Sequence, residues 1–168
     1  MAIYKIFPEK SATLYSFYPT VNTGLDEILE ISTYYSINAT DEVSRALIQF
    51  SSADIEDIIV NKVAGKTYDA YLKLYLANAS SLPQNATLHC YPISGSWNSG
   101  TGKLGDVPNP SDGVNWQFKD QVSGSHWFTN VFPPGTTGSC PTNNSGGGLW
   151  YTTGSLHATQ SMSKLTSK

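Results

Sequence analysis

The stretch Ala70-Tyr-Leu-Lys-Leu-Tyr-Leu76 decides the fold class that this sequence predicts. Along it, alanine and leucine side chains alternate with two tyrosines and a lysine. Successive side chains of a β-strand point to opposite faces of the sheet, so a period of two indicates a strand. The stretch is therefore predicted to be a strand with one wholly apolar face buried against a core.

Other stretches of the first half carry similar alternation. They are Ala12–Phe17, Glu27–Ser32, Arg45–Phe50 and Thr87–Ile93. In the third of these, Ala46, Ile48 and Phe50 share one face. Arg45 and Gln49 lie on the opposite face, so the pattern predicts an apolar side that packs inward and a polar side that faces outward.

One segment departs from the strand pattern and indicates a helix. Ser52 is a candidate N-cap, because a serine hydroxyl can accept a hydrogen bond from a free N–H of the first turn. Ile55, Ile58 and Ile59 then follow the i, i+3, i+4 spacing of one helix face. We expect a short helix near 53–61 that links two strands.

Short strands with turns between them and a single short helix indicate an all-β fold, a β-sandwich or jelly roll. The length of 168 residues suits one domain that spans residues 1–168. Most of the 14 glycines come after residue 93. The second half is therefore expected to hold long Gly-rich loops.

The charge pattern narrows the choice of partners. The formal net charge is -3, only 14% of residues are charged, and no basic run occurs. Phosphate contacts need clustered lysines and arginines, so nucleic acid is not expected as a partner. No apolar run approaches the roughly 18 residues of a membrane span, so no membrane is expected either. The opening residues 1–8 lack the basic and apolar regions of a secretory signal.

The cysteines and histidines do not form any familiar reactive motif. Cys90 and Cys140 are far apart in sequence, and two thiols made in a reducing cytoplasm are expected to stay free. The sequence contains three histidines, but it has neither the HExxH motif of zinc proteases nor the GxSxG motif of serine hydrolases. The stretch Gly100–Gly105 contains a GxG and a lysine, but its glycine spacing fits no phosphate loop. We expect no catalytic residue, no cofactor and no metal ion.

The stretch from Gln121 to Ser163 contains no charged residue, yet it holds several aromatic side chains. A surface of this kind is expected to lie against a partner. Four residues in it are candidates for contact with a partner or with a glycan: His126, Trp127, Trp150 and Tyr151. For Trp127 and Trp150 a place in the core is an equal alternative. Aromatic faces pack on sugar C–H groups, which keeps the glycan alternative open. Two earlier tryptophans, at positions 97 and 116, are expected in the core.

The order of several motifs adds a family resemblance. In chain order they are Ala12-Thr-Leu-Tyr15, Asn22-Thr-Gly24, Ser44-Arg-Ala-Leu-Ile-Gln-Phe50, Ala70–Leu76, Ser94-Gly-Ser-Trp97 and Gly113-Val-Asn-Trp116. This series resembles the DNRLRE-type β-sandwich, a carbohydrate-binding-module-like domain. The opening Met1-Ala-Ile-Tyr-Lys-Ile-Phe-Pro8, together with Gly24-Leu-Asp-Glu-Ile-Leu-Glu30, is similar to virion structural proteins of marine tailed phages of the cyanophage kind.

This resemblance implies a non-enzymatic role in a virion, made in the host cytoplasm. The expected function is that of a structural component, such as a neck, tail, baseplate, head-decoration or fibre-attachment protein. Its expected partners are other virion proteins and further copies of itself. The alternative is a carbohydrate-binding module that recognises a glycan on the host surface. A glycan hydrolase or lyase would need two acids that converge in one cleft, and the sequence gives no sign of such a pair.

The end of the sequence departs from the family pattern. Domains of this type finish with further strands, whereas this sequence ends at Ser163-Lys-Leu-Thr-Ser-Lys168. A sandwich without its closing strands exposes unpaired edges. We therefore expect either that this is the N-terminal part of a longer chain or that a neighbouring subunit supplies strands by β-augmentation.

Overall fold

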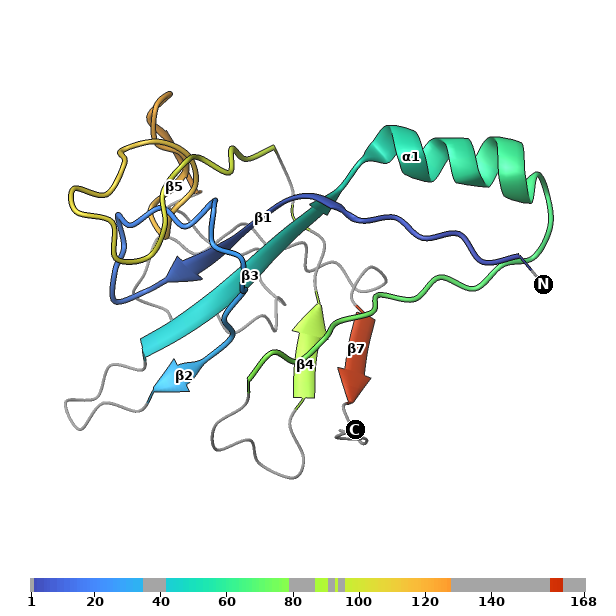
Figure 1. The fold of residues 1–168 in the computed structure, drawn as a ribbon, viewed down its shortest axis with the longest axis horizontal. Helices are drawn as coiled ribbons and strands as arrows, with labels where there is room; N and C mark the ends of the chain where they lie inside the picture. Colours follow the sequence, from blue (N-terminus) through green and yellow to red (C-terminus); the bar gives the residue numbers. More distant parts are fainter. Residues whose placement is uncertain are drawn as a thin grey trace, which may run out of the picture.

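The computed structural model describes residues 2–34, 42–78, 87–90, 93, 96–127 and 158–161. Its strands are β1 (Pro8–Tyr15), β2 (Thr33–Tyr34), β3 (Glu42–Phe50), β4 (Thr87–Cys90), β5 (Phe118–Asp120), β6 (Ser125–His126) and β7 (Ala158–Ser161). They form three small antiparallel sheets with the orders β1-β3-β2, β4-β7 and β5-β6 (Figure 1). With one short helix added, this agrees with an all-β class. The strands of these described ranges do not close into a two-sheet sandwich.

β1 and β3 make the longest ladder and form the framework of the body. In their register Ala12 lies opposite Leu47, and Leu14 lies opposite Arg45. The strands predicted at 12–17 and 45–50 are thereby confirmed, although both begin earlier than predicted. The strand predicted at 87–93 is present in part, as β4.

The core-facing side of β3 is the opposite of the one expected. Leu47 is fully buried there, and Arg45 lies on the same side. The apolar residues at 46, 48 and 50 lie on the other side of the strand and outside the buried cluster, so the prediction that they face the core is wrong. Arg45 fits the inner side because its guanidinium carbon lies 4.8 Å from the ring centroid of Trp116. A guanidinium on an aromatic face is stabilised while the aliphatic part of its side chain packs.

The hydrophobic core joins the two halves of the sequence. Its buried members are Ala12, Leu14, Leu47, Trp97, Val114, Trp116 and Trp127, with Val43 and Ile93 packed against them. Three of the seven are tryptophans of the second half, whose large rings cover the small and aliphatic side chains of β1 and β3. Burial of a tryptophan removes roughly 150–250 Å² from water, so these rings dominate the core energetics. The first half therefore does not form a core by itself.

Threonine side chains protect the outer edge of β1. The Thr13 N–H donates to Thr23 Oγ1 at 2.9 Å, and the Thr23 hydroxyl donates to the Thr13 carbonyl at 2.6 Å. Both residues are fully buried. One hydroxyl thus satisfies both edge groups of Thr13, which blocks further strand pairing at that point. Nearby, burial and a hydrogen bond to Glu30 raise the pKa of Tyr15 well above its ordinary value.

A helix follows β3 directly, close to the predicted position. It consists of α1 (Ser52–Asp57) and a π-helical continuation, η1 (Ile58–Val63). The N-cap is Ser51, not Ser52: the Ser51 hydroxyl accepts from the Asp54 N–H at 3.3 Å, and Ser51 has extended backbone angles. Neither α1 nor η1 contains a buried residue. On the isoleucine face that predicts the helix, Ile55 and Ile59 are exposed and Ile58 is only half-buried.

Two predicted strands are absent. Residues 70–76 are extended, but they join no ladder and every one of them is exposed. Residues 27–32 run irregularly into β2 instead of forming a strand. Residues 70–76 have the alternating sequence of a strand. What they lack is a neighbouring strand with which to form hydrogen bonds.

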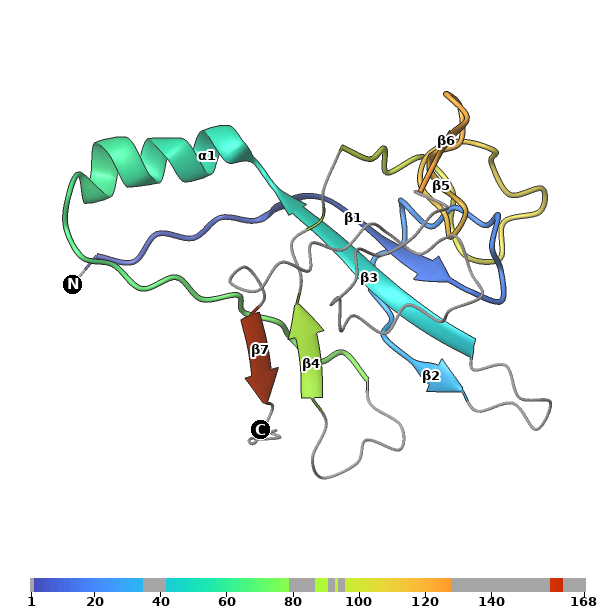
Figure 2. The same cartoon turned by 180° about the vertical axis from the view of Figure 1, so that it is seen from behind.

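We call residues 2–7, 52–63 and 66–76 together the arm. The three segments extend from the same side of the body, away from the β5–β6 end (Figures 1 and 2). We call residues 8–34, 42–50 and 96–127 the body. All the buried residues named above lie in it.

Asn22 is the hub that holds the body together. Its side-chain amide donates to the carbonyls of Ser99 and Val114, both at 2.7 Å. Its side-chain oxygen accepts from the N–H groups of Gly102 at 2.7 Å and Gly24 at 3.3 Å. The full hydrogen-bonding capacity of a buried amide is thus used between two loops that are about 80 residues apart in sequence.

The Asn22 backbone is paired as well. Its N–H donates to Asn109 Oδ1 at 2.9 Å, and its carbonyl accepts from Asn109 Nδ2 at 3.1 Å. Two glycines of the 100–105 stretch, Gly100 and Gly102, are required by this packing. A Cβ at Gly102 would lie 2.6 Å from the Asn22 carbonyl oxygen, and one at Gly100 would lie 2.5 Å from Asn22 Nδ2. The stretch is therefore a close-packed wall around Asn22.

Replacing Asn22 by alanine should lower the free energy of unfolding by about 3 kcal/mol or more. The change leaves two buried carbonyls and a buried N–H without partners, and each such group costs about 1–3 kcal/mol. Urea unfolding followed by tryptophan fluorescence measures the change. The matched control is Asn61→Ala on the exposed helix, where the loss should stay within about 0.5 kcal/mol. Equal effects of the two substitutions would contradict the hub.

Candidate functional site

A second buried asparagine positions the hairpin of β5 and β6. The side-chain oxygen of Asn115 accepts from the N–H groups of Gln117 at 2.9 Å and Phe118 at 2.8 Å. Its amide donates to Gln121 Oε1 at 2.8 Å. Its own carbonyl accepts from the indole N–H of Trp127 at 2.8 Å. Asn115 therefore fixes the start of β5, the hairpin turn and the residue after β6.

The hairpin lies beside the 96–98 segment and encloses a shallow pocket. The Asn98 N–H donates to the Lys119 carbonyl at 3.0 Å, and the Asn98 carbonyl accepts from the Val114 N–H at 2.7 Å. These bonds hold the two chain segments side by side. The pocket has a volume of about 280 Å³ and is lined by Ser96, Trp97, Asn98, Lys119, Asp120, Ser123 and Ser125.

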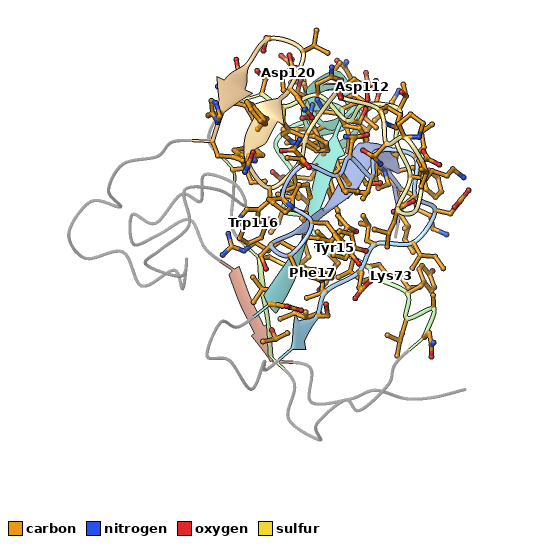
Figure 3. The ribbon with its side chains drawn as sticks, turned by 90° about the vertical axis from the view of Figure 1, so that its left-hand side faces the viewer. Tyr15, Phe17, Lys73, Asp112, Trp116 and Asp120 are labelled. Atoms are coloured by element: carbon orange, nitrogen blue, oxygen red, sulfur yellow. The ribbon has the colours of Figure 1, made fainter. Side chains whose placement is uncertain are left out.

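The lining of this pocket is polar and partly unpaired. In the described part of the chain, no group bonds the Asn98 side-chain amide nitrogen or the Lys119 ammonium. Asp120 Oδ1 accepts from the Val122 N–H at 3.2 Å, which fixes the carboxylate at the rim. Figure 3 shows Asp120 near the same rim of the body as Asp112. An amide, an ammonium, a carboxylate and serine hydroxyls around one tryptophan suit a small, neutral, hydroxyl-rich ligand.

Two of the four residues expected at a contact surface lie among the described residues. Trp127 is only 2% exposed, so of its two alternatives, core and contact surface, it belongs to the core, and its place among the contact residues is wrong. His126 is exposed, and its ring centroid lies 4.0 Å from that of Phe118. Trp150 and Tyr151 lie outside the described residues. The free thiol of Cys90 is half-buried, and Cys140 also lies outside them.

Trp97 and Trp116 are in the core, as predicted, and each carries a cation on its ring. Lys10 Nζ lies 4.6 Å from the Trp97 ring centroid and also donates to the Trp97 carbonyl. Arg45 covers Trp116 in the same way. The indole N–H of Trp116 is buried without a hydrogen-bond partner. Sequence patterns missed both cation contacts, because each joins residues that are more than 70 positions apart.

The carboxylates near the loops serve as structural acceptors. Asp112 binds the Thr101 N–H at 3.1 Å and the Thr101 hydroxyl at 2.8 Å. Asp106 accepts from the Lys103 N–H at 2.8 Å, and Asp26 accepts from the Leu104 N–H at 3.1 Å. Each acid thus closes a loop. Within the described ranges, histidine, cysteine and acidic side chains form no group that could hold a metal ion.

One exposed ion pair adds to the tie between the loops. Lys103 Nζ contacts Glu27 Oε1, and both side chains are open to solvent. The hydrogen bond from Lys103 lowers the pKa of Glu27, and the same bond raises the pKa of Lys103. An exposed pair of this kind contributes little to stability. Its value lies in orienting the two loops that meet at Asn22.

Comparison with protein-family models, with curated proteins and with solved structures gives no match for this chain. The helix that the structure describes is too short and too polar to cross a membrane, and no other described segment is helical.

Substitution of Trp127 by alanine should unfold the body rather than remove a binding surface. Loss of the buried indole leaves a cavity and an unpaired Asn115 carbonyl, so we expect the free energy of unfolding to fall by about 3–5 kcal/mol. The neighbouring change His126→Ala, at an exposed ring, should cost about 0.5 kcal/mol or less. Chemical denaturation of both variants distinguishes the two roles. An unchanged stability of Trp127→Ala would contradict its place in the core.

Proposed function

We propose that this chain works by protein–protein assembly, as a structural component of a tailed-phage virion. The observation that carries the proposal is the apolar surface of the arm. Large hydrophobic side chains lie exposed on all three of its segments: Ile3, Tyr4, Phe7, Ile55, Ile59, Val60, Tyr68, Tyr71, Leu72, Leu74, Tyr75 and Leu76. So many exposed large apolar side chains on neighbouring segments are uncommon on soluble monomers, and such surface marks a site of protein interaction.

The form of the arm supports assembly over catalysis. The helix follows Phe50 after a single residue, Ser51, so its direction is set by the rigid β3 strand. An element that projects from a body and buries nothing of its own is suited to docking on a neighbour. The opening residues 1–8 and the stretch 24–30 resemble virion structural proteins of marine tailed phages. This resemblance suggests the place of assembly: neck, tail, baseplate, head decoration or fibre attachment.

We also infer that the sandwich predicted by the sequence is completed by neighbours. Residues 70–76 have the alternation of a strand and an extended backbone, and they lack only a hydrogen-bonding partner. A neighbouring chain that pairs with them would extend the sheet by β-augmentation. The body would then supply one layer of the sandwich and the arm part of another.

Purified particles of the phage that encodes this chain provide the test. We expect several copies per particle, with the arm side chains covered by neighbouring chains in a density map at side-chain resolution. Burial of the apolar arm stabilises the assembly because it removes this surface from water. Absence of the chain from particles, or an arm that stays exposed to solvent in them, would rule out this function.

A second candidate function, recognition of a host-surface glycan, is favoured by the pocket beside Trp97. Its volume is about 280 Å³, and its unpaired amide and ammonium groups, together with the serine hydroxyls beside them, match sugar hydroxyls. This pocket differs from the surface that the aromatic residues of the sequence predict, because Trp127 is buried.

Glycan-array binding tests the second candidate. If the pocket binds sugars, a double variant with Asn98→Ala and Lys119→Met should lose at least tenfold in affinity, since two polar contacts to hydroxyls are removed. Asn61→Ala, on the helix, serves as the control and should bind like the unmodified chain. Lack of binding across a broad array, or binding that the double variant retains, would exclude this pocket as a sugar site.

A further inference from the structure

The arm contains two extended segments that both lack a strand partner. Residues 2–7 and residues 70–76 have no backbone hydrogen bond to any described residue, and neither belongs to a sheet. Their lengths are nearly equal. Ile3 and Phe7 are each 78% exposed on the first, and Tyr71 and Tyr75 are 84% and 81% exposed on the second.

The two segments run near each other within one chain without pairing. Both pass along the arm below the helix in the view of Figure 1. The pKa of Tyr75 is lowered chiefly by the ammonium of Lys73 and to a smaller extent by that of Lys5, so Lys5 lies close enough to act on it. Each arm therefore presents two strand-like edges on the same side of the molecule.

Two-fold symmetry satisfies both segments at once. In a symmetric dimer, a contact of segment i with segment j is accompanied by the reciprocal contact of j with i. One copy of this chain supplies the partner for residues 2–7 and the partner for residues 70–76 of the other. An unrelated protein would have to provide two separate strands in matching positions.

The surface available is sufficient for a stable interface. A fully exposed aromatic side chain offers roughly 150–250 Å², so the exposed fractions of the large arm side chains amount to on the order of 1,000 Å². A standard interface buries about 800 Å² on each partner. The charges on the two extended segments are few: Lys5 and Lys73.

We infer that the arm docks on the arm of a second copy of this chain about a two-fold axis, with residues 2–7 of each copy paired as a strand with residues 70–76 of the other. The apolar sides of α1 and η1, at Ile55 and Ile59, then cover the paired segments. This inference rests on the proposed assembly function and names the first partner in it.

Light scattering coupled to size-exclusion chromatography tests the inference on the purified full chain at tens of micromolar. We expect a mass of twice the 18.2 kDa of one chain. A double variant with Leu72→Lys and Leu74→Lys should run at the mass of one chain, because two charges per copy would otherwise be buried in the interface. The matched control, Val107→Lys with Val122→Lys, changes two exposed valines outside the arm and should keep the dimer.

Two further measurements keep the result interpretable. Fluorescence of the buried tryptophans shows whether the Leu72/Leu74 variant remains folded. If it does not, cross-linking decides: chains with Lys5→Cys are mixed under oxidation with chains that carry Lys73→Cys, at the centres of the two segments. Mass spectrometry should then detect a 5–73 disulfide, which only two different chains can form.

A monomeric unmodified chain, a dimer that the folded Leu72/Leu74 variant retains, or the lack of a 5–73 bridge would overturn the inference. The proposed function is judged separately. If the chain is monomeric but a particle map places the arm against a different protein, the assembly function stands and the second copy is wrong as the partner. If the chain dimerises through the arm but is absent from particles, the dimer stands and the virion role is wrong.

Discussion

The side chain of Asn22 is the interaction on which the body depends. An amide has two donors and an acceptor oxygen, and at this position all of them are bonded away from water, to Ser99, Val114, Gly102 and Gly24. Because an unpaired buried polar group costs more than a typical hydrogen bond contributes, such a hub permits only one arrangement of the loops. Gly100 and Gly102 pack so closely against Asn22 that a side chain at either position would clash with it. The three core tryptophans are brought over β1 and β3 as a consequence.

Polar hubs take the place of long strands in this fold. β5 and β6 have three and two residues, too few for a stable hairpin in water. Asn115 compensates by bonding the start of β5 and the indole of Trp127. Aspartates close the outer loops by accepting from backbone N–H groups in the same way. The second half therefore acquires a defined shape with little regular structure, which a pocket at its surface requires.

Local patterns in the sequence predicted those strands and helices that depend mainly on interactions between residues close in sequence. The alternation at 45–50 and the isoleucine spacing at 55–59 gave a strand and a helix close to where they lie. The inward side of β3 was wrong because Arg45 stacks on Trp116, a contact between distant residues. The Asn22-Thr-Gly24 motif is visible in the sequence, but its bonds to residues near 100 could not be inferred from spacing. The same holds for Trp127, whose burial depends on the carbonyl of Asn115. The pocket beside Trp97 exists only because these distant pairs meet.

The contrast between body and arm explains why the 70–76 pattern failed as a prediction for one chain. Alternation of apolar and polar residues indicates that a segment has two unlike faces and suits a sheet. It does not indicate which chain supplies the neighbouring strand. In the body, the edge of β1 is closed by Thr23, so it offers no site at Thr13 for another strand. The arm has no such protection: its leucines, its tyrosines and its backbone remain open. A chain that blocks one edge and leaves another free is suited to pairing with a neighbouring chain, which is the arrangement that the proposed assembly would use.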